Sequence, residues 1–367
     1  MSKIRNIGLD VHKNSIVMAV ADSDGGEPAE LGTIPNDHVQ LLKRLRKLGR
    51  ESELRVCYEA GPTGYGLYRE LNAAGIKCVV IAPSLVPTQS GNRVKTDRRD
   101  AARLARFLRS GDLTYVHVPD ETTEGIRDLT RAREDAKALE RTVRHQLGKF
   151  LLRNGRIYAN GNNWTQKHLA WIRTQKFVHP GQEQVLVDYL KAVEDAKSRV
   201  ERLTECIREV AKEWKLAPRV TALQALRGVQ FITAVTLCAE LFDFKRFGKA
   251  NELMAYLGLT PSEYSSGESR RQGGITKTGN GHVRKLLVES AWSYRYRPAM
   301  SDGIRKRNQG VAENVRKIAW RAQERLHGRY NLMMGKGKSK QKTVVAVARE
   351  LAGFIWAIGQ EDNLLAG

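Results

Sequence analysis

Four carboxylates in the first third of the chain have the types and settings of a metal-dependent nuclease core. Asp10 and Glu59 each end an apolar run, and Asp97 and Asp100 stand three positions apart at the start of an expected helix. Carboxylates gathered at one point repel one another, so a divalent cation, here Mg²⁺, is the usual reason to gather them. In a strongly basic protein, we expect the substrate of such a site to be a phosphodiester.

Each carboxylate also has a plainer interpretation, which for Glu59 is an ordinary surface residue. Asp10 would suit a turn cap, or the first phosphate loop of a sugar-kinase or actin type of ATPase, although the second glycine-rich hairpin of such a protein is not visible in the sequence. Asp97 would suit a helix N-cap, and Asp100 a first-turn charge that favours the helix dipole. The cations around the second pair favour a site that holds both metal and phosphate. They are Lys95, Arg98, Arg99 and Arg103.

A second candidate site lies in a polar, glycine-rich stretch of the last third of the chain. Adjacent hydroxyls at Ser265 and Ser266 are followed by Arg270, Arg271 and Lys277. Hydroxyls, glycine amides and cations together can offer one phosphate a nucleophile and neutralising charge. A polar loop rich in turn-forming residues is the competing interpretation.

The composition narrows the class of protein and its partners. With 367 residues and 41% hydrophobic content, the chain is long and apolar enough for two or three folded domains. A net charge of +22 and a pI near 10.0 favour a polyanionic partner, with a merely soluble surface or a membrane-surface protein as the plainer alternatives. We see no apolar run of about 18 residues and no secretion signal, so we expect a cytoplasmic protein with no membrane partner. The scattered cysteines predict a reducing compartment and no structural zinc.

The elements that must position the carboxylates alternate between strands and helices. Expected strands cover 4–10, 15–21, 29–34, 54–59 and 77–82, and expected helices cover 37–49, 64–74 and 97–109. Three strands in a row followed by helix–strand units predict an α/β domain with a mixed sheet covered by helices. This order matches the RuvC-like, or ribonuclease-H-like, layout by fold analogy alone. We assign residues 1–112 to this domain.

Two long helices are expected next, at 120–152 and 182–215. Apolar residues recur every seven positions in the second, which predicts a coiled coil, either a hairpin within one chain or a dimerising coil. These positions are Leu186, Val193, Val200, Ile207 and Trp214. We assign residues 113–215 to a helical coiled-coil region for linkage or dimerisation. Within it, 153–181 is a connection or cap to which we assign no secondary structure.

The remaining residues, 216–367, are expected to form a mainly α-helical domain with a basic tail after about residue 330. Residues 261–367 hold 20 Lys or Arg and 9 Asp or Glu, so 20 − 9 = +11, half of the whole excess. A flexible basic loop at 335–342 suits backbone phosphates, and a solvated surface loop is the alternative. Its lysines are Lys336, Lys338, Lys340 and Lys342.

Six short strings, three in the first domain and three in the last, together form one pattern. Those of the first domain are Ile7-Gly8-Leu9-Asp10, Tyr58-Glu59-Ala60-Gly61 and Thr96-Asp97-Arg98-Arg99-Asp100-Ala101. Those of the last domain are Leu257-Gly258-Leu259-Thr260-Pro261, Ser266-Gly267 and Thr276-Lys277-Thr278-Gly279-Asn280. In order and spacing, over nearly the whole length, the chain resembles the bridge-RNA-guided DEDD transposases, the IS-one-ten group of insertion-sequence recombinases.

The resemblance implies a RuvC-like domain that holds Mg²⁺ on the four carboxylates, and a transposase domain whose nucleophile is Ser266. Ser265 directly precedes that residue, and only the Ser-Gly match separates the two. The resemblance also implies a coiled coil that mediates dimers, a tetramer on DNA, and active sites shared between subunits. A structured guide RNA, the bridge RNA, would pair with donor and target double-stranded DNA.

We therefore expect an RNA-guided, site-specific DNA recombinase that works by Mg²⁺-dependent phosphoryl transfer through a phosphoserine link. Arg270, Arg271 and Lys277 would neutralise developing charge, while Arg98 and Arg99 would contact nucleic acid. The alternative is a RuvC-like nuclease of the junction-resolvase type, which uses water and leaves no protein–DNA adduct. A non-catalytic nucleic-acid scaffold is a third interpretation, but clustered acids would only weaken its hold on phosphate.

Overall fold

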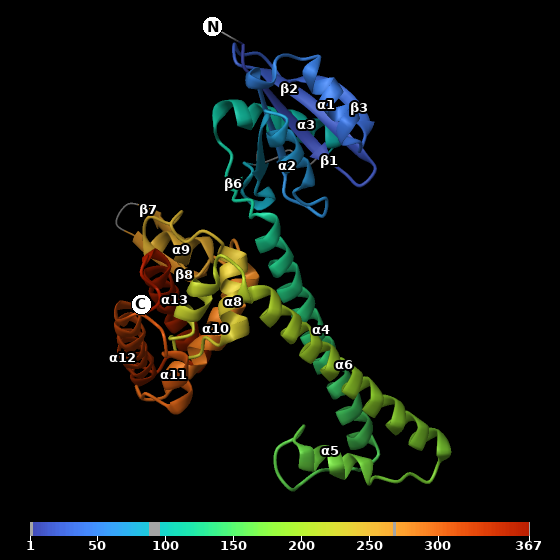
Figure 1. The fold of residues 1–367 in the computed structure, drawn as a ribbon, viewed down its shortest axis with the longest axis vertical. Helices are drawn as coiled ribbons and strands as arrows, with labels where there is room; N and C mark the ends of the chain where they lie inside the picture. Colours follow the sequence, from blue (N-terminus) through green and yellow to red (C-terminus); the bar gives the residue numbers. More distant parts are fainter. Residues whose placement is uncertain (1–2, 88–95, 267–268, 367) are drawn as a thin grey trace. The chain divides into compact units, whose positions relative to one another are not determined.

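The computed structural model describes residues 3–87, 96–266 and 269–366, without the side chains of residues 265–270. The chain divides into two compact units, Met1–Pro119 and Asp120–Gly367 (Figure 1). Within the described part of the chain, no helix combines the length and apolar character needed to cross a membrane.

The first unit is built on a mixed sheet of six strands in the order β3-β2-β1-β4-β5-β6. Strands β1, β4 and β5 run parallel, whereas β2, β3 and β6 run antiparallel to their neighbours. The five predicted strands are confirmed to within one residue, and the layout is consistent with a RuvC-like domain. The sixth is too short for its periodicity to be recognised. The strands are β1 (Arg5–Val11), β2 (Ser15–Asp22), β3 (Ala29–Pro35), β4 (Leu54–Glu59), β5 (Lys77–Ile81) and β6 (Tyr115–Val116).

Helices cover both faces of this sheet: α1 (His38–Arg46) and α2 (Gly66–Ala73) on one, α3 (Asp97–Ser110) on the other. The alternation of side chains along a strand separates the two faces. Ile7 and Leu9 of β1 pack with the apolar stripes of α1 and α2. Ala19 and Ala21 of β2 pack against α3 through its own alanines. The part of α3 that packs on β2 is therefore made of small side chains, which lets the helix lie close to the sheet there.

Gly8 is the point of closest approach between β1 and α3. A Cβ added at Gly8 would run into Ala101 O and would lie 2.5 Å from Ala105 N and 2.9 Å from Leu104 Cβ. Two of these three atoms belong to the helix backbone, so no side-chain rotation could make room. The absence of a side chain at position 8 thus sets the height of α3 above the sheet.

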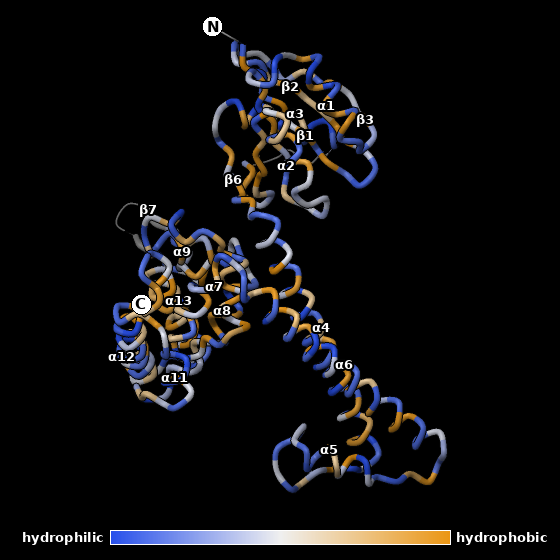
Figure 2. The backbone as a smooth tube through the Cα atoms, viewed as in Figure 1, coloured by the Kyte–Doolittle hydropathy of each residue, from blue (hydrophilic) through white to orange (hydrophobic). Residues whose placement is uncertain are grey.

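Two long helices of the second unit, α4 (Glu121–Arg153) and α6 (Pro180–Lys212), pack antiparallel within one chain. Near one end Trp214 Nε1 donates to Thr123 Oγ1 at 3.2 Å, and near the other the rings of Phe150 and Tyr189 meet. Hydrophobic positions recur along both helices (Figure 2). Both helices are confirmed, whereas coiled-coil geometry and dimerisation stay predictions. The connection, left open from sequence, contains α5 (Gln166–Arg173).

The rest of the second unit is mainly helical, as predicted, and shares one large core. The exception is an antiparallel hairpin, β7 (Pro261–Ser266) and β8 (Ser269–Ile275), in a stretch expected to be helical or loop. The helices are α7 (Ala217–Leu223), α8 (Phe231–Leu241), α9 (Ala250–Tyr256), α10 (Gly281–Ala291), α11 (Asp302–Arg307), α12 (Glu313–Gly335) and α13 (Lys340–Gln360).

The expectation of a flexible basic loop at 335–342 is wrong. Helix α12 continues to Gly335 and α13 begins at Lys340, so only a short turn separates them. Helix α13 carries an apolar stripe that is fully buried, including Val344, Leu351 and Ile355. The lysines stand out in the sequence by charge, but the helical spacing of the apolar residues that follow them decides the local structure.

Candidate metal centre and serine hairpin

The sheet brings Asp10 and Glu59 to one edge. Strands β1 and β4 are parallel neighbours with Leu9 opposite Tyr58, so the carboxyl ends of both strands meet there. Gly8 and Cys57 face α3, and side chains two positions further along a strand share that face. Both carboxylates therefore lie on the side of the sheet that α3 covers.

Helix α3 brings the other two carboxylates to the same edge, because Asp97 and Asp100 occupy its first turn. Asp100 is buried and begins a stripe that continues through Leu104. Thr96, and not Asp97, is the N-cap: its side chain accepts a hydrogen bond from Arg99 N. The interpretation of Asp97 as the N-cap is therefore wrong, and its carboxylate is not used to cap the helix.

Among the described residues, one group of side chains could hold a metal ion: Asp10, His12 and Asp97, whose ligand atoms all lie within 4.8 Å of one another. His12 Nε2 lies 3.3 Å from Asp10 Oδ2 and 3.5 Å from Asp97 Oδ2. Asp10 is partly buried, while the other two are exposed. The centre is thus open to solvent on one side.

The pKa of Asp10 is set by its burial and by the charged groups around it. Burial raises the pKa of Asp10; His12 opposes this rise, and the charges of Asp97 and Asp100 add to it. The ionised form of Asp10 is therefore disfavoured in the protein alone. A bound cation would remove that penalty, which is how metal sites differ from ordinary surface acids.

Arg103 joins the remaining two carboxylates of the predicted set. Its Nη2 lies 2.9 Å from Asp100 Oδ1 and 3.9 Å from Glu59 Oε1. The four acids thus form two subsets, one around His12 and one around Arg103. The guanidinium supplies Glu59 and Asp100 with the positive charge that a second metal ion would otherwise provide.

The donor set fits a divalent metal ion. Two carboxylate oxygens suit Mg²⁺, and the added imidazole nitrogen of His12 would also suit Mn²⁺. The family expectation of metal dependence is therefore met by a possible acidic site. The donor set leaves the choice of metal open.

The predicted cations near this edge are exposed. Arg98 Nη1 lies 3.6 Å from Glu30 Oε2, and Arg99 is exposed in the first turn of α3. Lys95 lies outside the described residues. Exposed arginines beside an acidic site can turn toward a phosphate without first losing a buried contact.

Ser266 ends strand β7 and pairs with Ser269 of β8, so it stands at the turn of the hairpin. The side chains of Ser265, Ser266 and Arg270 lie outside the described set, as do Gly267 and Glu268. Arg271 is exposed and lies opposite Tyr264, whose side chain is 77% exposed. The described part of the hairpin thus reaches into solvent.

Two glycines join the base of this hairpin to its surroundings. Gly258 and Gly279 have φ values of +61° and +66°, a region that other residues avoid. A Cβ on Gly258 would lie 2.5 Å from Thr278 N, and one on Gly279 would run into Tyr256 O. Lys277 N donates to Gly258 O at 3.1 Å. The two strings that flank the serine in sequence are therefore packed together backbone to backbone.

A buried carboxylate, Glu240, ties this base to the long helix α4. Arg131 donates to it twice, at 2.8 and 3.1 Å, and Asn280 Nδ2 donates at 2.8 Å. Burial alone would raise the pKa of Glu240, but the hydrogen bonds from Arg131 and Asn280 outweigh it and the pKa is lowered. Asn280 also caps α10 by accepting from Val283 N.

The other predicted nucleic-acid contacts are exposed lysines of the second unit. Lys277 has a φ of +58° at the hairpin base and is exposed. The four predicted lysines at the junction of the two helices are also exposed: Lys336 and Lys338 in the turn after α12, and Lys340 and Lys342 in the first turn of α13.

Sequence reasoning missed His12, Glu240 and Arg131 as members of these sites. For His12 a signal was present, because it lies two positions after Asp10 and so shares its face of the strand. Glu240 and Arg131 are separated by 109 positions and are joined only by the packing of α8 against α4. Nothing in either local sequence marks that pair.

Two family models match the chain. One, described as the transposase family IS116/IS110/IS902, matches residues 220–304, and the other, a DEDD transposase model, matches residues 7–154.

Similar curated proteins extend this match to nearly the full length. A Sinorhizobium fredii protein classed among transposases, y4qE, is 45% identical over 97% of this chain and 88% of its own length. The transposase for insertion sequence element IS1533 of Leptospira borgpetersenii is 30% identical over 92% of this chain and 98% of its own. That for IS1111A of Coxiella burnetii is 25% identical over 79% and 78%.

Proposed function

Since this chain belongs to the IS116/IS110/IS902 family of transposases, we propose that it is an RNA-guided, site-specific recombinase that acts through a phosphoserine link. Family membership establishes a transposase of an insertion sequence, an enzyme that cuts and rejoins DNA. RNA guidance and serine chemistry are the proposed part. The observation that carries the proposal is the gathering of Asp10, Asp97 and Asp100 at one sheet edge with a metal-capable donor set.

In the proposed reaction Asp10, His12 and Asp97 would hold a metal ion, and Glu59 and Asp100 would join the set if Arg103 left them to pair with a phosphate. A bound Mg²⁺ supplies charge that polarises the scissile phosphate and favours the ionised form of an attacking hydroxyl. Ser266 Oγ forms an ester with the phosphorus while the oxygen of the cut strand leaves as a hydroxyl. A hydroxyl of the strand to be joined then attacks that ester and releases Ser266.

The cations near the serine would act in the same step. Arg270, Arg271 and Lys277 neutralise charge that develops on the phosphate oxygens, where fixed donors are most effective. Arg98 and Arg99 hold the DNA backbone at the metal edge. The four lysines of the turn after α12 and of the first turn of α13 add phosphate contacts that carry no sequence information.

The proposed partners follow from charge and from the long helices. A net charge of +22 supports binding of a structured guide RNA together with donor and target double-stranded DNA. Exposed apolar side chains along α4 and α6, such as Leu139, Val187 and Val210, support a homodimer that assembles into a tetramer on DNA, with serine and metal edge from different subunits. We propose 1–112, 113–215 and 216–367 as the functional domains, acting in a bacterial cytoplasm.

The test is to trap the covalent link. Full-length protein, its RNA and end-labelled element DNA are incubated with Mg²⁺ and then denatured, and the labelled DNA that migrates with protein is measured. We expect Ser266→Ala to lose both adduct and cleavage while it binds DNA and RNA as the wild type does. Ser265→Ala is the matched control and should keep the adduct. An adduct that persists in Ser266→Ala would refute the serine assignment, and wild-type cleavage without any adduct would indicate water as the nucleophile.

A further inference from the structure

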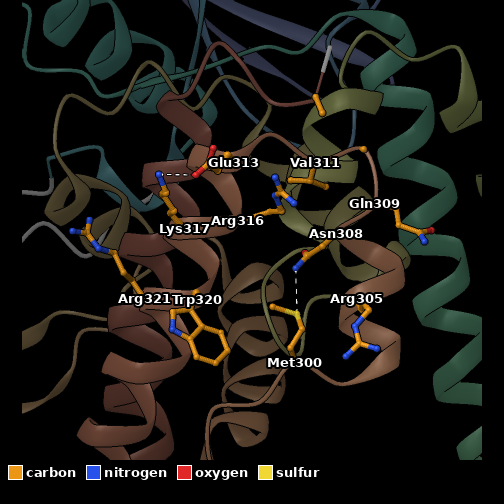
Figure 3. Close-up of a pocket in the computed structure, with 12 residues that line it drawn as sticks. Met300, Arg305, Asn308, Gln309, Val311, Glu313, Arg316, Lys317, Trp320 and Arg321 are labelled. Carbon is orange, nitrogen blue, oxygen red and sulfur yellow. Dashed lines mark hydrogen bonds and ion pairs between the residues drawn. The ribbon is translucent and has the colours of Figure 1, made fainter.

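A groove lies between α11 and the N-terminal part of α12. None of its lining residues has been given a role in the metal centre or the serine hairpin. Its volume is about 1000 Å³, and its wall includes Arg305, Asn308, Arg316, Trp320 and Arg321. Figure 3 shows side chains from both helices around the same space. We propose that this groove binds an unpaired stretch of nucleic acid, with one base stacked on Trp320 and the flanking phosphates on Arg316 and Arg321.

The charge of the groove suits a polyanion. Four cations and one anion line it, so the net charge of the wall is 4 − 1 = +3. Lys317 is paired with Glu313 at 2.8 Å. Arg316 and Arg321, by contrast, take part in no ion pair within the described part of the chain. Two exposed guanidinium groups with no ion pair among the described residues are available for the phosphates of a bound strand.

Trp320 makes the groove different from a plain basic surface. Its indole Nε1 donates to Glu324 Oε1 one helical turn further on, at 2.8 Å, and the ring is only partly buried. The polar edge of the ring is thus satisfied and its orientation held, while part of the ring stays accessible. A base inside a duplex keeps its faces against its neighbours, so an aromatic ring among cations indicates an unpaired base.

A polar atom in the groove is left without a partner. Asn308 Oδ1 is buried and accepts no hydrogen bond from the described residues. Its Nδ2 lies 3.6 Å from Met300 Sδ (Figure 3). Buried acceptors are nearly always satisfied in proteins, so this one is suited to a donor from a ligand, such as a base amine or a sugar hydroxyl.

This site deepens the proposed nucleic-acid function and rests on it. The experiment measures binding by fluorescence anisotropy with labelled, unstructured RNA and DNA of about 15 nucleotides and a DNA duplex of equal length, across a salt series. For Trp320→Ala we expect single-strand binding to weaken roughly tenfold or more, with duplex binding and salt dependence unchanged. Comparing the two single strands shows whether RNA or DNA is the preferred occupant.

The charge variant gives an independent measure. Replacing both arginines, Arg316→Gln with Arg321→Gln, should lower the slope of log K against log [salt] by about 1.4, about 0.7 for each lost phosphate contact on a single strand. The matched control is Arg199→Gln with Arg202→Gln on α6. Both are exposed, without ion pairs among the described residues, and give the same change of net charge. Thermal melting confirms that each variant is folded.

The outcomes for the groove can be told apart from those for the recombinase function. Equal loss of affinity in the control pair would show that net charge is responsible, and would overturn the groove. Wild-type single-strand binding by Trp320→Ala would overturn the stacking. If the adduct of Ser266 still forms in that case, the groove fails while the recombinase function stands. Failure of the function itself would appear as no adduct in the wild-type protein, whatever the groove variants do.

Discussion

Replacing Gly8 with alanine tests whether the height of α3 above the sheet sets the geometry of the metal edge. The new methyl group would lie 2.5 Å from Ala105 N, and ordinary contacts begin at about 3.4 Å. The helix must therefore retreat by at least about 0.9 Å (3.4 − 2.5), because Ala101 O lies closer still and a backbone atom cannot rotate aside. Asp97 and Asp100 would move with α3 and away from Asp10, which stays on β1.

The expected magnitudes differ for stability and for activity. Overpacking of this kind costs about 1–3 kcal/mol, so the first unit should remain folded with a melting temperature lower by several degrees. A displacement of about 1 Å in a reacting group lowers rates by about a hundredfold. We therefore expect DNA cleavage by Gly8→Ala to fall about a hundredfold and to need more metal for half-maximal rate.

The assay pairs cleavage of labelled element DNA over a Mg²⁺ titration with thermal melting of the same preparation. Gly66→Ala is the matched control, because a Cβ at that position would meet nothing within 4 Å. It should melt and cleave like the wild type, or melt slightly higher, since it restricts the unfolded chain. Wild-type cleavage and melting by Gly8→Ala would show that α3 can move freely, and would refute the reasoning.

Two further predictions concern buried carboxylates. Asp10→Asn should abolish metal-dependent cleavage, yet melt no lower than the wild type in EDTA, because burial and the charges of Asp97 and Asp100 disfavour the ionised Asp10 when no metal is bound; a large fall in melting temperature would contradict this. The lowered pKa of Glu240 contributes stability that is present above its unfolded value, near 4.5, and is lost as pH falls through the folded pKa. Glu240→Gln should therefore lower the free energy of unfolding by about 1 kcal/mol at neutral pH, a small value because solvent screens the half-exposed Arg131. Its melting temperature should also depend less on pH below 4.5 than that of the wild type.

Local pattern was enough to predict much of the first unit. Strand alternation and helical spacing follow from where apolar side chains recur, so five strands were predicted to within one residue. The same spacing predicted the two long helices of the second unit. Asp10 and Glu59 could be assigned to one edge because parallel strands end on the same side of a sheet. The hairpin at Pro261–Ile275 was not predicted, since its polar, glycine-rich residues carry no apolar alternation.

The sequence by itself determined the elements and the chemical types available: four acids, a serine pair and an excess of cations. Only the tertiary structure decided how they are divided, with His12 between Asp10 and Asp97 and with Arg103 between Glu59 and Asp100. The groove at Trp320 likewise arises where two helices and a loop meet. The physical reason is that periodicity is a property of neighbouring residues, whereas a site is a property of distances between residues that the chain keeps far apart.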